Sequence, residues 1–147
     1  MNDLSKLTRQ HYEKNEARAS LVSNVTKILD SLPAGSSTLR SLLAWTNFTS
    51  WLAATEQLAQ IAGIERGTTI LDAGSGLGGP SRYLASTYGC RVIGADLSPS
   101  FVAVAQVLAQ RNGLDALVSF YGPELTSAQR CPESAESFVI LLQSRNV

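Results

Sequence analysis

From Thr68 onward, short apolar runs alternate with longer amphipathic stretches, and Gly or Pro separates most of them. Apolar runs of four to six residues are typical of buried strands, whereas apolar positions three and four apart are typical of helices. A regular alternation of the two predicts a parallel sheet with helices packed on it. The pattern predicts strands over 68–73, 91–95, 117–121 and 137–142, and helices over 80–88 and 99–112.

The ends of the second predicted helix carry recognisable signals. Ser98 is suited to cap its start, Pro99 to occupy its first turn and Gly113 to end it. Upstream of Thr68 the spacing predicts helices over 3–32 and 51–62, the latter stopped by Gly63. We expect the chain to divide into an N-terminal helical segment, residues 1–55, and an α/β domain, residues 56–147.

Four glycines stand within six residues, between the first predicted strand and the helix that follows it. They are Gly74, Gly76, Gly78 and Gly79. Glycine tolerates positive φ and lets bare backbone approach a ligand, and a helix start adds unpaired N–H groups with partial positive charge. The turn predicts a binding site for a nucleotide-like small molecule, the alternative being a glycine-rich turn without a ligand.

Two acids narrow the choice of ligand. Gly74, Gly76 and Gly79 fit G-x-G-x-x-G, which dinucleotide-binding folds share. Asp72 precedes the first of these glycines by two residues, where a carboxylate disfavours pyrophosphate and suits a cationic or amino-bearing arm. Asp96 ends the next apolar run, where an acid accepts hydrogen bonds from ribose hydroxyls. S-adenosylmethionine fits this combination better than NAD, although Asp72 could cap the turn and Asp96 the next helix.

The segments Leu71–Gly78, Gly79–Ala85 and Gly89–Pro99 resemble class I S-adenosylmethionine-dependent methyltransferases, of the small-molecule type that includes the glycine/sarcosine and phosphoethanolamine N-methyltransferases. The resemblance implies a Rossmann-like sheet with helices on both faces and methyl transfer to a small-molecule acceptor. It implies that Asp96 binds the ribose and that Leu97 lies against the adenine. It implies a cofactor-arm site at Asp72, Ala73, Gly74, Ser75, Gly76 and Gly78, with Gln143 as a further candidate at the end of the fourth predicted strand.

The related fold has seven strands in the spatial order 3-2-1-4-5-7-6, of which only four can be placed in this sequence. We therefore expect an incomplete sheet in a C-terminally truncated chain, with activity of the chain alone left open. The apolar run 138–142 would then form an edge strand. Exposed apolar edge strands favour association between chains, so self-association through this edge is an open alternative. The alternatives are an inactive or split cofactor-binding fragment and an NAD-type oxidoreductase, and no catalytic base is assigned.

Composition removes several other classes of function. Lys plus Arg and Asp plus Glu each number 12, so the formal net charge is zero. The basic residues are scattered and form no stripe that would contact phosphates, so nucleic acid is not the expected partner. No apolar run approaches the roughly 20 residues of a membrane span, and the N-terminus lacks the apolar core of a signal peptide. Cys90 and Cys131 have no metal-site spacing. A cytoplasmic protein with reduced thiols, no metal and no membrane partner is expected.

Overall fold

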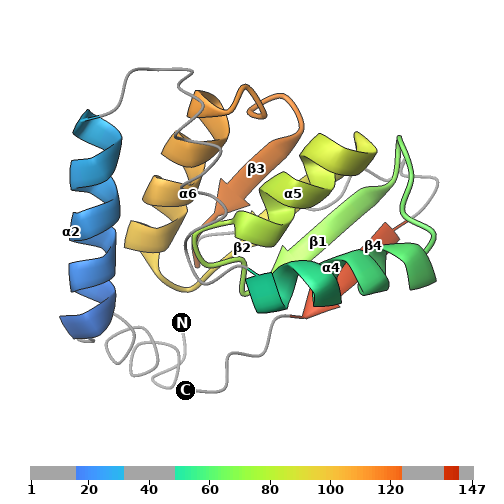
Figure 1. Cartoon of the computed structure of the whole chain (residues 1–147), viewed down its shortest axis with the longest axis horizontal. Coiled ribbons are helices and arrows are strands. Elements are labelled where there is room, and N and C mark those ends of the chain that lie inside the picture. The colour runs from blue at the N-terminus through green and yellow to red at the C-terminus, as the bar shows by residue number, and fades with distance from the viewer. Residues whose placement is uncertain (1–15, 32–48, 124–137, 143–147) are drawn as a thin grey trace.

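The computed structural model describes residues 16–31, 49–123 and 138–142 (Figure 1). Every predicted element that falls on these residues is present, with bounds within one or two residues of the prediction. The 3–32 helix is described only from Glu16, and its earlier part lies outside the described residues. The elements are α2 (Glu16–Ser31), α4 (Thr49–Ile61), β1 (Thr69–Ala73), α5 (Gly79–Tyr88), β2 (Arg91–Ala95), α6 (Pro99–Arg111), β3 (Val118–Tyr121) and β4 (Phe138–Leu142).

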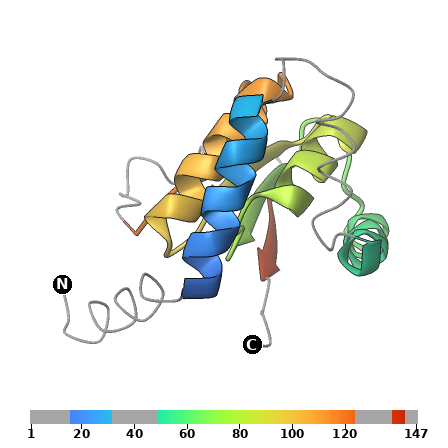
Figure 2. The same cartoon turned by 60° about the vertical axis from the view of Figure 1, so that its left-hand side comes forward.

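The four described strands form one parallel sheet in the order β3-β2-β1-β4. Ala73 at the end of β1 pairs with Ala95 of β2 and Leu142 of β4, and Ala95 pairs with Tyr121 of β3. The carboxyl ends of all four strands therefore meet at one edge of the sheet (Figure 1). This order confirms the predicted α/β Rossmann-like arrangement, in which ligands bind beyond the carboxyl ends of the strands. The described helices lie on one face of the sheet (Figures 1 and 2), so helices on its second face stay a prediction.

Helices α5 and α6 cover one face of the sheet, with α5 over β2 and α6 over β3 (Figures 1 and 2). Helix α4 packs against α5, and α2 packs against α6 on the outer side. Burial of apolar side chains between sheet and helices is the main stabilising contribution. The core combines strand and helix side chains, among them Ile70, Val92, Val118, Phe120, Leu84, Val102 and Ala105.

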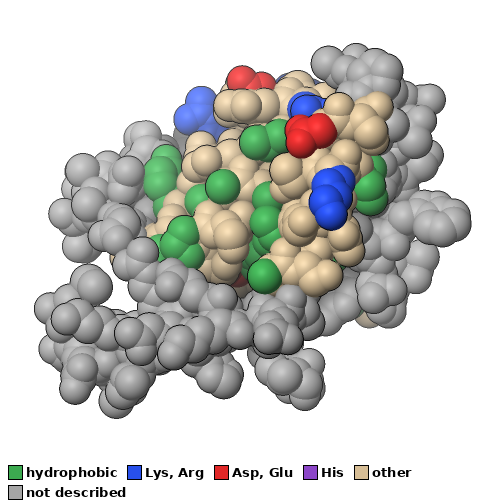
Figure 3. Space-filling model, turned by 90° about the vertical axis from the view of Figure 1, so that its left-hand side faces the viewer, with side chains coloured by type: hydrophobic (Ala, Val, Ile, Leu, Met, Phe, Trp, Pro, Cys, Tyr) green, Lys and Arg blue, Asp and Glu red, His purple; other side chains and the backbone are tan. Residues whose placement is uncertain are grey.

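The α2 side of the molecule is less completely buried. Leu21 and Ile28 of α2 and Val107 of α6 are each a little under two-fifths exposed. On this face, apolar side chains stand in separate groups among polar surface (Figure 3). Isolated exposed apolar residues are normal on a soluble surface and identify no binding site by themselves.

The predicted helix ends are confirmed for glycine and corrected for serine. Gly113 has φ of +66°, and the amide of Leu114 donates to the Ala109 carbonyl at 2.9 Å, which closes α6 as a Schellman motif. Ser98 holds the N-cap position of α6, but its hydroxyl makes no capping bond and instead contacts the Ser100 hydroxyl at 3.0 Å. The predicted side-chain cap is therefore wrong, because the neighbouring hydroxyl competes for the Ser98 side chain.

The described part of the chain is predicted to hold neither a membrane span nor a metal site. None of its helices is long and apolar enough to span a membrane, and it contains no cluster of His, Cys, Asp and Glu able to hold a metal ion. Cys90 is a buried free thiol, whereas Cys131 lies outside the described residues. The division at residues 55 and 56 stays a prediction, and α4 runs across it.

Candidate functional site

The glycine-rich turn joins the end of β1 to the start of α5, at the carboxyl edge of the sheet. Gly74, Gly76 and Gly78 have φ of +83°, +55° and +71°, a region that side chains with a Cβ adopt only with strain. Three left-handed residues in alternation turn the chain sharply at this edge, and Gly76 and Gly78 are buried in the turn. The glycine composition therefore follows from the geometry of the turn, before any ligand is considered.

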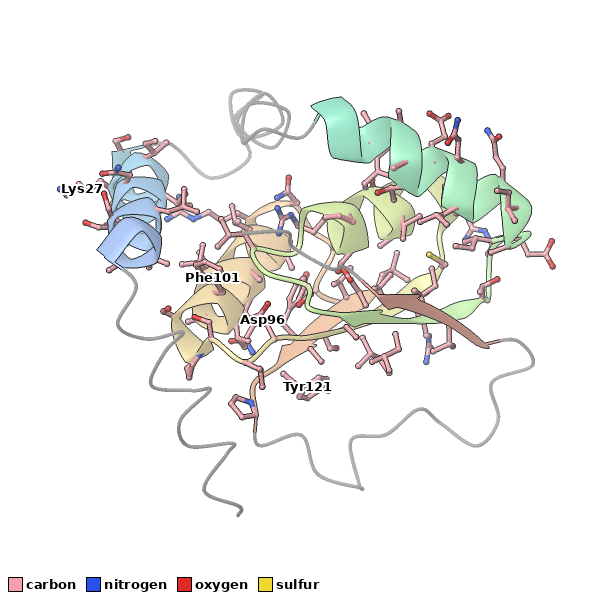
Figure 4. The ribbon with its side chains drawn as sticks, turned by 90° about the horizontal axis from the view of Figure 1, so that it is seen from below. Lys27, Asp96, Phe101 and Tyr121 are labelled. Carbon is pink, nitrogen blue, oxygen red and sulfur yellow. The ribbon has the colours of Figure 1, made fainter. Side chains whose placement is uncertain are left out.

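The turn is held against β2 by three hydrogen bonds. The amides of Gly74 and Ser75 donate to the Ala95 carbonyl at 2.8 and 3.1 Å. The Gly76 amide donates to Oδ2 of Asp96 at 2.8 Å, and the Ser98 amide donates to Oδ1 at 2.8 Å. Figure 4 shows Asp96 beside Tyr121 at this edge of the sheet. Since a carboxylate offers about four lone-pair positions, two protein donors leave Asp96 able to accept further hydrogen bonds from a ligand.

Asp72 lies beneath the turn and is fully buried, with 0% of its surface exposed. The hydroxyl of Ser81 in α5 donates to its Oδ2 at 2.5 Å. This hydrogen bond joins the end of β1 to the first turn of α5, so Asp72 stabilises the turn that lies between them. This contact gives Asp72 a structural role, whereas the capping of the turn that the sequence left open and contact with a ligand arm both stay predictions.

Arg82 is a residue of the site that the sequence analysis missed. Only 4% of its surface is exposed, and Nη1 donates to the Leu77 carbonyl at 2.5 Å. Burial lowers the pKa of Arg82 to about 9. Among the described residues its Nε has no hydrogen-bond partner, and the same holds for the buried hydroxyl of Ser75. The usable sequence signal is an arginine four residues after Gly78, which puts a cation in the first turn of α5.

The Phe120 ring requires glycine at two positions, Gly78 and Gly94, for a reason independent of any ligand. A Cβ at Gly78 would lie 2.2 Å from Cζ of Phe120, and a Cβ at Gly94 would lie 2.4 Å from its Cδ1. The Phe120 ring, on β3, therefore occupies space that only glycine leaves open in β2 and in the turn. The sequence predicts only a ligand-binding role for Gly78, because a local motif does not reveal the approach of a ring from a distant strand.

Of the other predicted site residues, all but Gln143 fall on residues that the structure describes. Ala73, Gly74, Ser75, Gly76 and Gly78 form one continuous segment that the sheet register brings beside Asp96. Leu97 follows Asp96 directly and is 44% exposed, so its apolar side chain is accessible at this edge. Gln143 lies outside the described residues, so its proposed contact is untested.

Comparison with known proteins identifies the family. A family model described as a methyltransferase domain matches residues 70–146, which is more than half of the chain. The chain belongs to this family. It is a class I S-adenosylmethionine-dependent methyltransferase domain, as its motifs indicated.

The curated relatives are methyltransferases and are considerably longer than the matched region. Erythromycin 3''-O-methyltransferase of Saccharopolyspora erythraea is 37% identical over 83 residues, which cover 56% of this chain and 26% of that protein. Sterol 24-C-methyltransferase of Saccharomyces cerevisiae is 41% identical over 63 residues, which cover 43% of this chain and 16% of that protein. The methyltransferase domain described here thus corresponds to less than a third of these relatives' length.

Among solved structures, the fold is similar to that of an RNA methyltransferase from Salinibacter ruber in complex with S-adenosyl-L-homocysteine. The TM-score is 0.50 at 23% sequence identity, and the match covers 62% of this chain and 58% of that one. At this identity the similarity concerns the fold alone. It supports the same conclusion as the strand order, that this methyltransferase domain is built on a Rossmann-like sheet.

Proposed function

We propose that this domain binds S-adenosylmethionine at the glycine-rich turn and Asp96 and transfers its methyl group to a small-molecule acceptor. The observation that carries the proposal is the hydrogen bond from the Gly76 amide to Asp96, which places the glycine-rich turn beside the acid that we assign to the ribose hydroxyls. Membership of the methyltransferase family supports the same ligand.

The residues present fit this cofactor. Asp96 keeps acceptor positions for the two ribose hydroxyls, and the exposed side chain of Leu97 offers an apolar surface for adenine. The glycines give the turn the left-handed conformation that sets its backbone beside Asp96, where the methionine arm is assigned. We assign this arm to the segment from Asp72 to Gly78, with Asp72 supporting the turn and Gln143 as a further candidate.

The bound cofactor supplies an activated methyl group, so the protein needs no metal or nucleophilic residue of its own for the transfer. The work of the described residues is to bind and orient. The turn and Asp96 fix one partner of the reaction in place, and fixing reactants in line with one another is a large part of catalysis. A catalytic base is not assigned to any described residue.

The acceptor class comes from the relatives. Their names identify acceptors such as erythromycin and sterols, which are small molecules. We propose an acceptor of this broad class, in agreement with the zero net charge of the chain, which gives no electrostatic support for nucleic acid. A cytoplasmic location is part of the same proposal.

Isothermal titration of the full chain with S-adenosylhomocysteine tests the cofactor assignment. We expect saturable binding that Asp96→Ala weakens strongly, and no comparable binding of NADH. Asp115→Ala, which removes an exposed acid in the loop after α6, serves as the matched control. Absence of binding by the unmodified chain, or tighter binding of NADH, contradicts the proposal.

A second candidate function is an inactive or split cofactor-binding fragment. It is favoured by the small share of the relatives that the matched region covers, 16% and 26% in the two described above. Transfer of labelled methyl from S-adenosylmethionine to a panel of small hydroxyl and amine acceptors separates the two. Cofactor binding without transfer to any acceptor favours the fragment. The comparisons give no support to the NAD-type oxidoreductase alternative.

We further propose that the outer edge of β4 pairs with a second copy of this chain. Among the described strands, β4 has a neighbour only on its β1 side, and its sequence Phe-Val-Ile-Leu-Leu is entirely apolar. An apolar edge with unpaired backbone groups favours association. Light scattering across a hundredfold range of protein concentration tests this, and a constant monomer mass contradicts it.

A further inference from the structure

The guanidinium of Arg82 is buried, but the hydrogen bonds that the described residues give it satisfy only some of its donors. Its guanidinium, 4% exposed as a whole residue, makes one described hydrogen bond, from Nη1 to the neutral carbonyl of Leu77. Its buried Nε has no partner among the described residues. Burying a cation is costly unless its donors are paired, and a single bond to a neutral oxygen offsets only part of that cost. Packing alone therefore does not account for an arginine at this position.

The residue that Arg82 holds is the centre of the glycine turn. The Leu77 side chain packs against the buried pair Val104 and Leu108 of α6, as do Val22 and Val25 of α2. Its carbonyl is held from the other side by Arg82. Leu77 is thus fixed at both its side chain and its backbone.

The residues on either side of Leu77 are also held in place. The next residue, Gly78, is so close that a Cβ there would lie 3.1 Å from Nη1 of Arg82. The preceding residue, Gly76, donates its amide to Asp96. Because glycines are the most flexible residues, ordering this turn at the moment of binding would cost conformational entropy. A side chain that keeps the turn ordered beforehand improves affinity for whatever the turn binds.

We propose that Arg82 is a positioning residue of the cofactor site: by holding the Leu77 carbonyl it keeps the Gly76 amide opposite Asp96 and so raises the affinity for S-adenosyl ligands. The inference rests on the proposed function for its ligand, and on the contacts of Leu77 for its mechanism. Arg82 acts through the turn, and no contact between its side chain and the ligand is required.

Titration of the full chain with S-adenosylhomocysteine is the first test. Arg82→Met keeps the bulk of the side chain but removes its donors, and we expect about a tenfold loss of affinity, of the size of one charge-assisted hydrogen bond. Arg82→Lys restores a charged donor, and we expect its affinity within about threefold of the unmodified chain. Arg91→Met, at an exposed arginine at the start of β2, is expected to bind normally.

A merely structural role is excluded by a matched destabilised variant. Leu84→Ala removes a fully buried side chain from the same helix but leaves the Leu77 contact in place. Measured well below both melting temperatures, it should bind like the unmodified chain. Equal loss of affinity in Leu84→Ala and Arg82→Met overturns the proposal, and so does normal binding by Arg82→Met.

Amide hydrogen exchange separates failure of this proposal from failure of the proposed function. The amides of Gly76 and Gly78 are bonded to Asp96 and to the Ser75 carbonyl, and we expect both to exchange about tenfold faster in Arg82→Met. The Arg91 amide, bonded to Thr68 far from the turn, should be unaffected. If the unmodified chain binds no S-adenosylhomocysteine, the proposed function fails while the exchange data still decide whether Arg82 orders the turn.

If Arg82→Met does not fold, Arg82→Gln carries the same measurements, since it keeps a neutral donor. We expect intermediate affinity and intermediate exchange in that variant. Failure of both neutral variants to fold, with Arg82→Lys folding normally, identifies a structural role and overturns the proposal.

Discussion

The backbone amide of Gly76 donates a 2.8 Å hydrogen bond to Oδ2 of Asp96, which lies twenty residues further along the chain. The bond crosses from the turn after β1 to the end of β2, because the two parallel strands end side by side with Ala73 paired to Ala95. A single carboxylate thus fixes the turn and keeps acceptor positions for a ligand.

Replacing Asp96 by alanine should therefore lower stability as well as ligand affinity. The substitution removes the acceptor for two backbone amides, those of Gly76 and Ser98. Hydrogen bonds to charged groups contribute about 1.5–3 kcal/mol each, and we expect a loss of about 2 kcal/mol in the free energy of unfolding because Asp96 is only partly buried. Urea denaturation measures this, and a change below about 0.5 kcal/mol would show that the two contacts are dispensable.

Ser81→Ala should destabilise the protein by about 1.5–3 kcal/mol, because it removes the hydroxyl that donates to the buried carboxylate of Asp72. Ser86→Ala in the same helix is the control. The Ser86 hydroxyl donates to the Tyr83 carbonyl at the exposed surface, and its loss should cost less than about 0.5 kcal/mol. Thermal denaturation of the pair decides the prediction. Equal melting temperatures would mean that Asp72 does not depend on Ser81.

Gly94→Ala should cost about 1–3 kcal/mol through overpacking, since the new methyl would meet Phe120 at 2.4 Å. In a Phe120→Ala background the same substitution should cost much less, because the obstructing ring is gone. Gly122→Ala, where a Cβ would have nothing within 4 Å, is the neutral control. A double-mutant cycle by chemical denaturation measures the coupling, and strict additivity would disprove the steric explanation.

Cys90 should be inert in the native protein. The residue is completely buried, and burial raises the pKa of its thiol to about 11. In a Cys131→Ser background we expect no reaction with a thiol reagent at pH 8 until the chain unfolds, and prompt reaction in denaturant. Rapid stoichiometric labelling of the folded protein would contradict the buried position.

The same shift predicts a loss of stability in alkali. The unfolded thiol ionises near its ordinary pKa of 9.0, whereas the folded thiol stays protonated up to about pH 11. Above pH 9 the unfolded state therefore binds fewer protons, and stability falls as the pH rises between these values, by up to about 2 kcal/mol. Cys90→Ala should lack this part of the pH dependence. Denaturation curves of both proteins at pH 8 and pH 11 test it.

The sequence by itself determined the elements and their order. Short apolar runs, apolar positions three and four residues apart, and the helix stops at Gly63 and Gly113 are local signals, because they depend on backbone conformation within a few residues. The turn glycines and the acid at the end of β2 were also readable, since the motif encodes the conformation that its residues must adopt.

Only the tertiary structure decided which residues support the turn from within. The contacts of Asp72 with Ser81, of Arg82 with the Leu77 carbonyl and of Phe120 with two glycines join elements through side-chain directions that no local pattern specifies. The Ser98 hydroxyl likewise contacts the Ser100 hydroxyl and does not make the predicted capping bond. A sequence fixes which conformations each segment can adopt, but complementary packing between distant segments selects the partners of buried polar groups.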